Sequence, residues 1–143
     1  MKKLYGLSFT LILVFALFLI PSASAAPVPH LTSIQIVGIT SDGANNVWSN
    51  SNLSGTQGVI AVKCIGTILG SPPRPTITQN GVFIPTTQYQ PNEYITQGNN
   101  VIGTIYYRAF NLSDVSTGSL TASAQDYHAP NKTYTTSINI KVQ

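Results

Sequence analysis

The chain has 143 residues, a formal net charge of +3 and only 8% charged residues, and 43% of its residues are hydrophobic. This length suits one ordinary domain, and the hydrophobic fraction excludes a disordered chain. The single cysteine excludes both an intramolecular disulfide and a zinc site built from several cysteines.

The N-terminal segment has the three parts of a secretory signal peptide. Two lysines follow the initiating methionine, ten apolar residues run from 11 to 20, and Ser22–Ala25 are all small. The apolar run is shorter than the about 20 residues that a membrane-spanning helix needs. We therefore predict cleavage between Ala25 and Ala26, and a secreted, extracellular protein that keeps no membrane segment.

This cleavage would divide the chain into a signal peptide, residues 1–25, and one domain, residues 26–143. The domain holds five basic and four acidic side chains, which leaves it a net charge of +1, five minus four. A nearly neutral domain gives no electrostatic reason to expect a nucleic-acid partner.

The sequence of the domain predicts an all-β fold. Its apolar positions are mostly β-branched or aromatic, and no stretch shows a sustained apolar period of 3.6 residues, so we predict no helix. An Asn80–Gly81 pair between two short apolar segments predicts a two-residue hairpin turn. We predict seven to eight strands over residues 31–39, 58–69, 75–79, 82–84, 93–97, 101–110, 120–127 and 134–142. Short strands at this spacing indicate a single antiparallel β-sandwich, with residues 40–57 as a long loop.

The C-terminal part of the domain carries a resemblance to a known fold. Residues 120–126 (LTASAQD), a turn containing Asn131 and residues 135–142 (TTSINIKV) resemble the last two strands of bacterial immunoglobulin-like domains. The resemblance implies an immunoglobulin-like sandwich with a role in adhesion or binding, because this fold hosts many functions.

A second resemblance covers most of the domain. Residues 26–37 (APVPHLTSIQIV) and 98–107 (GNNVIGTIYY) resemble a family of small, uncharacterised secreted Bacillus proteins, the YolA family. This resemblance implies an extracellular protein and supplies no catalytic residues.

Cys64 lies on the apolar face of the predicted strand 58–69, so we expect a buried thiol. Immunoglobulin-like domains often carry half of their inter-sheet disulfide on this strand. The partner strand has Ala122 and Ala124 but no cysteine, so that bond is absent. A disulfide between two copies of the chain is the alternative.

Aromatic residues are the best candidates for ligand contact: Trp48, Tyr106, Tyr107 and Tyr127. Exposed tryptophan and tyrosine rings can stack on sugars or dock a protein partner. Neighbours in a strand face opposite ways, so one of Tyr106 and Tyr107 should point outward. The alternative is that these rings belong to ordinary sheet surface and core, and Trp48 would equally suit one end of the core.

We find no catalytic or metal-binding pattern. A hydrolase triad would need His128, Asp126 and a serine, but no serine has the nucleophile-elbow pattern, and His128 suits a turn. Calcium would find only one carboxylate, Asp42, in Ser41–Asn46, so we expect an Asx-type turn there. We predict no enzyme activity and no cofactor.

These features together predict a small secreted β-sandwich that acts as a non-enzymatic binding or interaction module at or outside the cell surface. Its expected partner is a protein or a cell-wall polysaccharide, and we expect a monomer. A secreted inhibitor or antimicrobial factor is the alternative, suggested by the proline-rich segment 71–75 (SPPRP) and the small size.

The signal-peptide prediction has a direct test. Protein secreted by a bacterium that expresses the full chain should begin at Ala26 and have 118 residues, 143 minus 25. N-terminal sequencing together with intact mass would measure both. Secreted material that begins at Met1 would contradict the prediction.

Overall fold

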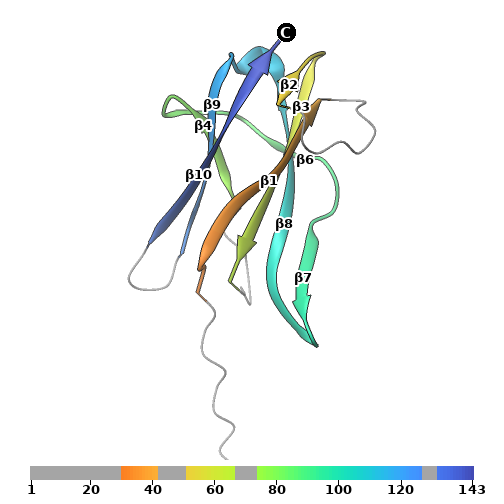
Figure 1. Ribbon diagram of the computed structural model, residues 1–143, viewed down its shortest axis with the longest axis vertical. Helices are drawn as coiled ribbons and strands as arrows, with labels where there is room; N and C mark the ends of the chain where they lie inside the picture. Colours follow the sequence, from red (N-terminus) through yellow and green to blue (C-terminus); the bar gives the residue numbers. More distant parts are fainter. Residues whose placement is uncertain (1–29, 42–50, 67–73, 127–131) are drawn as a thin grey trace, which may run out of the picture.

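The computed structural model describes residues 30–41, 51–66, 74–126 and 132–143, and within them it shows two β-sheets packed face to face (Figure 1). The first sheet contains β1 (Ser33–Ser41), β3 (Gln57–Ile65), β8 (Asn100–Asn111) and β6 (Thr87–Gln88) in spatial order, and β7 (Glu93–Gln97) also pairs with β8. The second sheet contains β2 (Asn52–Leu53), β10 (Thr133–Val142), β9 (Gly118–Gln125), β4 (Thr76–Gln79) and β5 (Val82–Phe83). A single 3-10 turn, η1 (Leu112–Asp114), connects β8 to β9.

The predicted all-β sandwich is confirmed. Every pair of neighbouring strands is antiparallel except β2 with β10, which is parallel. The spatial order of the longer strands is β1-β3-β8-β7 in one sheet and β10-β9-β4 in the other. This is the order A-B-E-D and G-F-C of an immunoglobulin-type sandwich.

All eight predicted strand segments contain a strand. The predicted end of the second segment, residues 67–69, lies outside the described residues. Two strands, β2 and β6, were not predicted, and β2 falls inside the segment 40–57 expected to be a loop. Each has only two residues and is defined by pairing with a distant partner, β10 or β8, so local sequence carries no signal for it.

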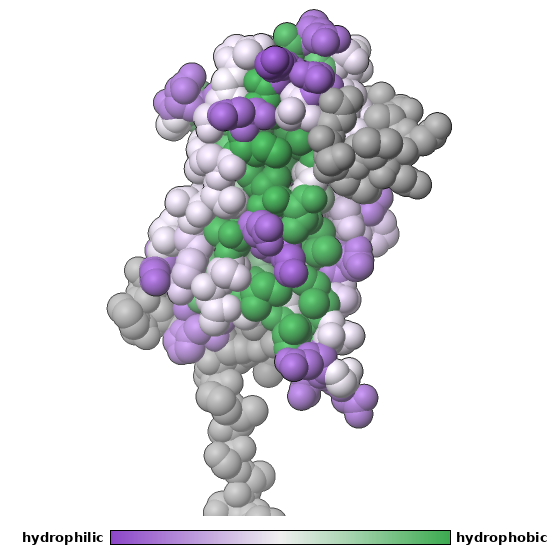
Figure 2. Space-filling view, viewed as in Figure 1, coloured by the Kyte–Doolittle hydropathy of each residue, from purple (hydrophilic) through white to green (hydrophobic). Residues whose placement is uncertain are grey.

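The core lies between the sheets and is built from alternate residues of the facing strands. β3 contributes Ile60, Val62 and Cys64, and β9 contributes Leu120, Ala122 and Ala124, all at most 4% exposed. Burying an isoleucine, valine or leucine side chain stabilises the fold by about 1.5–3 kcal/mol. Half-buried isoleucines of β1 and β10 extend this core to one side, where Figure 2 shows an apolar stripe between the two strands.

Specific polar contacts fix the ends of the strands. The predicted Asn80–Gly81 hairpin turn is present between β4 and β5, with φ of 51° and 79° at the two turn residues. Gln79 is buried, but its amide donates to the Ser116 carbonyl at 2.7 Å and accepts from the Ser116 N–H at 2.9 Å. A buried side chain with both ends satisfied in this way ties β4 to the β8–β9 connection.

Gly66 approaches the backbone before β1 so closely that only glycine, which has no Cβ, fits there. Its φ is +122°, and a Cβ at this position would overlap the His30 carbonyl oxygen and the Leu31 backbone. The main chain just before β1 therefore packs directly on the chain that leaves β3. Thr32 continues this contact by donating its N–H to the Ile65 carbonyl at 2.8 Å.

Replacement of Gly66 should therefore destabilise the sandwich more than replacement of Gly55, another glycine with positive φ. Gly55 has φ +96° and open space around the position of a Cβ. We expect Gly55→Ala to lower the free energy of unfolding by about 1–2 kcal/mol through backbone strain alone. Gly66→Ala adds a steric clash, so its loss should be about 3 kcal/mol or more. Urea unfolding of both variants would measure the difference, and equal losses would refute the close packing.

Candidate anion-binding site

The structure places only two of the four aromatic candidates among the described residues, because Trp48 and Tyr127 lie outside them. Tyr106 faces the core and is 1% exposed, so it offers no ring to a ligand at the surface. Tyr107 lies on the opposite face of β8, but it is also buried, and its hydroxyl donates to Glu93 Oε2 at 2.7 Å. Tyr107 therefore points outward, as alternation predicts, but neither ring is exposed, because Tyr106 enters the core and Tyr107 packs against the neighbouring strand β7 through Glu93.

Cys64 is a free thiol that faces the core. Burial raises its pKa to about 12, so the thiol is protonated at neutral pH and has no nucleophilic character. Its strand and β9 lie in opposite sheets, as the resemblance to immunoglobulin-like domains implied.

Asp126 pairs with His30, which lies 96 positions earlier in the chain. His30 Nδ1 lies 2.9 Å from Asp126 Oδ2, and the carboxylate is buried while the imidazole is half exposed. The pair joins the chain just before β1 to the end of β9. His128, the histidine of the triad hypothesis, lies outside the described residues.

Metal and membrane sites gain no support from the described parts of the chain. No cluster of three or more histidine, cysteine or acidic side chains there is placed to hold a metal ion. The only helical element in those parts is η1, and no helix among them has the length and apolar character needed to cross a membrane.

The unusual feature of the interior is a charged side chain, Arg108. It pairs with Ile60 of β3, and it shares one face of β8 with the core residues Tyr106 and Phe110. The register of β3 with β8 is continuous, so alternation places Arg108 on this inner face as well. Arg108 is 9% exposed, which is rare for an arginine unless its charge is compensated.

Arg108 lacks that compensation among the described residues. Its Nε is buried and has no hydrogen-bond partner. The Tyr106 hydroxyl is also buried and has no partner in hydrogen-bonding geometry, although the Thr104 hydroxyl lies nearby. Burial is the main cause that raises the pKa of Tyr106 to about 12, so this hydroxyl keeps its proton and can donate it. Each unsatisfied buried polar group costs about 1–3 kcal/mol.

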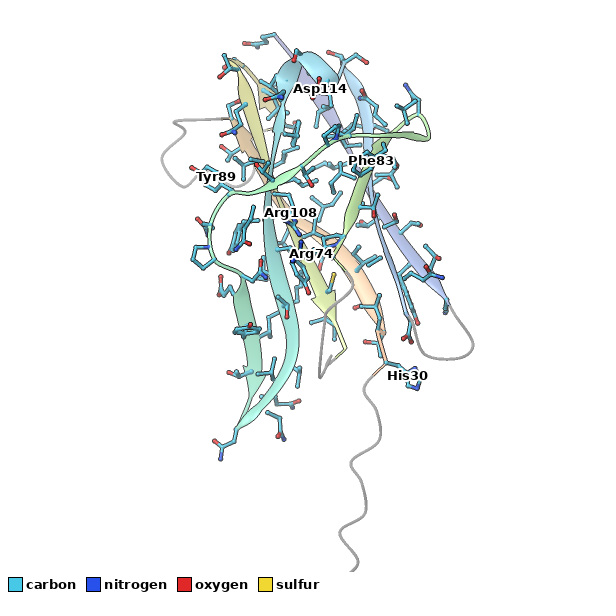
Figure 3. All side chains as sticks on the ribbon, turned by 180° about the vertical axis from the view of Figure 1, so that it is seen from behind. His30, Arg74, Phe83, Tyr89, Arg108 and Asp114 are labelled. Atoms are coloured by element: carbon cyan, nitrogen blue, oxygen red, sulfur yellow. The ribbon has the colours of Figure 1, made fainter. Side chains whose placement is uncertain are left out.

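A second arginine lies beside the first. Arg74 is exposed, just before β4, and Figure 3 shows it next to Arg108 between β8 and β4. Burial lowers the pKa of Arg108, and the nearby positive charge of Arg74 lowers it further. The two guanidinium groups therefore lie close enough for their like charges to repel.

The acidic side chains that could neutralise this pair are used elsewhere. Glu93 accepts a hydrogen bond from the Tyr107 hydroxyl on the outer face, and Asp126 is hydrogen-bonded to His30. Asp114 is exposed in η1, at the far end of β8. The fourth acidic residue, Asp42, lies outside the described residues. The structure thus gathers positive charge at Arg108 and Arg74 with no carboxylate among the described residues to balance it.

This arrangement suits an anion. A guanidinium presents its N–H groups as a planar fork that matches the two oxygens of a carboxylate or phosphate. The site is not evident from the sequence, because a lone arginine in a strand normally faces solvent. The alternation of Thr104, Tyr106, Arg108 and Phe110 was the available signal, since it puts Arg108 on one face with two aromatic residues.

Comparison with known proteins gives the chain a family. Residues 26–140 match the family model DUF4879, a domain of unknown function. A search among curated proteins finds no match. The family match covers nearly all of the sandwich, from Ala26 to Ile140 in β10. The chain therefore belongs to the DUF4879 family.

Proposed function

We propose that the protein is a secreted, non-enzymatic binding module that recognises an anionic group of its ligand through Arg108 and Arg74. The observation that carries this proposal is the buried guanidinium of Arg108, with an unpartnered Nε and a second arginine beside it. The signal-peptide pattern supports secretion, and the family match begins at Ala26, where the predicted mature chain starts.

The energetics favour a role in binding over a role in folding. A buried ionic group is weak evidence for stability, because desolvation opposes any attraction it makes. Among the described residues, the ionised side chain that acts on Arg108 is the like-charged Arg74, so their interaction adds to that cost. An anion placed between Arg74 and Arg108 would neutralise the repulsion and supply acceptors for the guanidinium N–H groups.

Anion binding should appear as ligand-dependent stability. Sodium acetate and sodium phosphate, each compared with sodium chloride at equal ionic strength, should raise the unfolding temperature of the wild-type protein. A ligand at ten times its Kd adds about 1.4 kcal/mol. Arg108→Met should remove this increment, which thermal unfolding would measure.

Lys141→Met is the matched control for that experiment. It removes the same unit of charge from an exposed residue of β10, whose backbone bond to Ser51 stays intact. Phosphate also stabilises proteins by exclusion from their surface, and that contribution should persist in both variants. An identical anion response in wild type and Arg108→Met would overturn the proposed function.

The same variant makes a prediction without any ligand. Arg108→Met keeps most of the apolar stem and removes the buried charge, so we expect the free energy of unfolding in chloride to rise by about 1 kcal/mol. Urea unfolding would measure it. A loss of 2 kcal/mol or more would instead assign Arg108 a structural role.

A further inference from the structure

The inner face of the first sheet continues beyond the arginine pair. β7 pairs with β8 so that Tyr94 stands opposite Thr104, and Thr104 shares its face with Tyr106 and Arg108. Tyr94 is 66% exposed, in contrast to the buried Tyr106. The two tyrosines are close enough for Tyr94 to influence the pKa of Tyr106. Tyr94, Thr104, Tyr106 and Arg108 thus form one row, which we call the inner row.

From this row we infer that the ligand is a polysaccharide whose sugars carry carboxylate groups, with a sugar ring on Tyr94 and a carboxylate at Arg108 and Arg74. The inference rests on the proposed function and names the ligand class of the same site. Its basis is the combination of an exposed aromatic ring, buried hydroxyls and guanidinium groups in a single row.

The dimensions of the row favour a polymer over an isolated ion. Tyr94 stands level with Thr104, and Arg108 lies four positions further along β8 than Thr104, which corresponds to about 13 Å along a strand. A ligand that touches both ends of the row is therefore larger than a single anion. Tyrosine rings offer an apolar face with a polar tip, which suits the faces and hydroxyl edges of sugars.

The charge of the site favours a sparsely charged polymer. Two arginines can neutralise one or two anionic groups, whereas nucleic acids present a phosphate every few ångströms and are bound by many cations. The domain as a whole has only five basic residues.

The test is binding of the full secreted chain to four immobilised polymers. The first is polygalacturonate, which carries a carboxylate on each sugar, and the second is its fully methyl-esterified form, which is neutral. The third is polyphosphate and the fourth is single-stranded poly(A). We expect retention on polygalacturonate and at least tenfold weaker retention on the ester. Retention on polyphosphate and on poly(A) should be no stronger than on polygalacturonate.

Variants connect the binding to the inner row. Arg74→Gln changes an exposed residue and Arg108→Met changes the buried one, and both should weaken binding to polygalacturonate at least tenfold. Tyr94→Ala should weaken it about three- to tenfold through loss of ring stacking. Tyr89→Ala is the matched control, because Tyr89 is also exposed but its N–H bonds to the Tyr107 carbonyl, so Tyr89 stands opposite Tyr107 and outside the inner row.

The outcomes separate the two proposals. Equal binding to polygalacturonate and its ester, or equal effects of Tyr94→Ala and Tyr89→Ala, would overturn the inference. Arginine-dependent binding to polyphosphate or poly(A) without binding to polygalacturonate would overturn the inference and leave the proposed function standing. Loss of binding to every anionic polymer, together with no anion effect on stability, would overturn both.

Discussion

The antiparallel pairing of β3 with β8 is the constraint on which the rest of the structure depends. It runs from Gln57 opposite Asn111 to Ile65 opposite Gly103 without a register shift. A slip of one residue would exchange the two faces of β8, so that Arg108 would turn to solvent and Tyr107 would enter the core. The register is held in part by glycines. Gly58 leaves room for the ring of Phe110, and Gly103 lets the Cys64 carbonyl approach, where a Cβ would stand only 2.5 Å from the nearest atom in each case.

Much of this fold could be predicted from the sequence because local patterns determine it. The Asn80–Gly81 turn and the alternation in β10 are properties of a few consecutive residues, and the strands they predict are present. β2 and β6 could not be predicted, because two residues become a strand only when a distant strand pairs with them. For the same reason, the sequence does not reveal that both faces of β8 are buried. Tyr107 looks like a surface ring in the sequence, but its position between β3 and the chain after β6 covers it.

Gln79 and Arg108 are both buried on the inner side of the sandwich, but their polar groups are satisfied to very different degrees. Gln79 has both ends of its amide bonded to Ser116, so its burial costs little and fixes a connection. Arg108 is a stronger donor with a full charge, but its Nε is left without a partner. Folding alone gives no reason to keep such a residue, because an apolar side chain of similar length would fill the same space without desolvating a charge. The burial of Arg108 is explained if its cost to the isolated fold is offset by the stabilisation of a complex with an anionic ligand.

The distribution of negative charge also favours an anionic ligand at the arginine pair. The described acidic side chains lie outside the inner row. Glu93 is hydrogen-bonded to Tyr107 on the outer face, Asp126 is hydrogen-bonded to His30 before β1, and Asp114 is exposed in η1. The arginine pair therefore faces a row of hydroxyl and ring groups in which the described residues provide no counter-charge. An anion in such a setting is attracted more strongly than in water, because the surrounding dielectric is lower. Affinity would then come from one anionic group bound by the arginines. Selectivity would come from the part of the ligand that packs on the neighbouring ring of Tyr94.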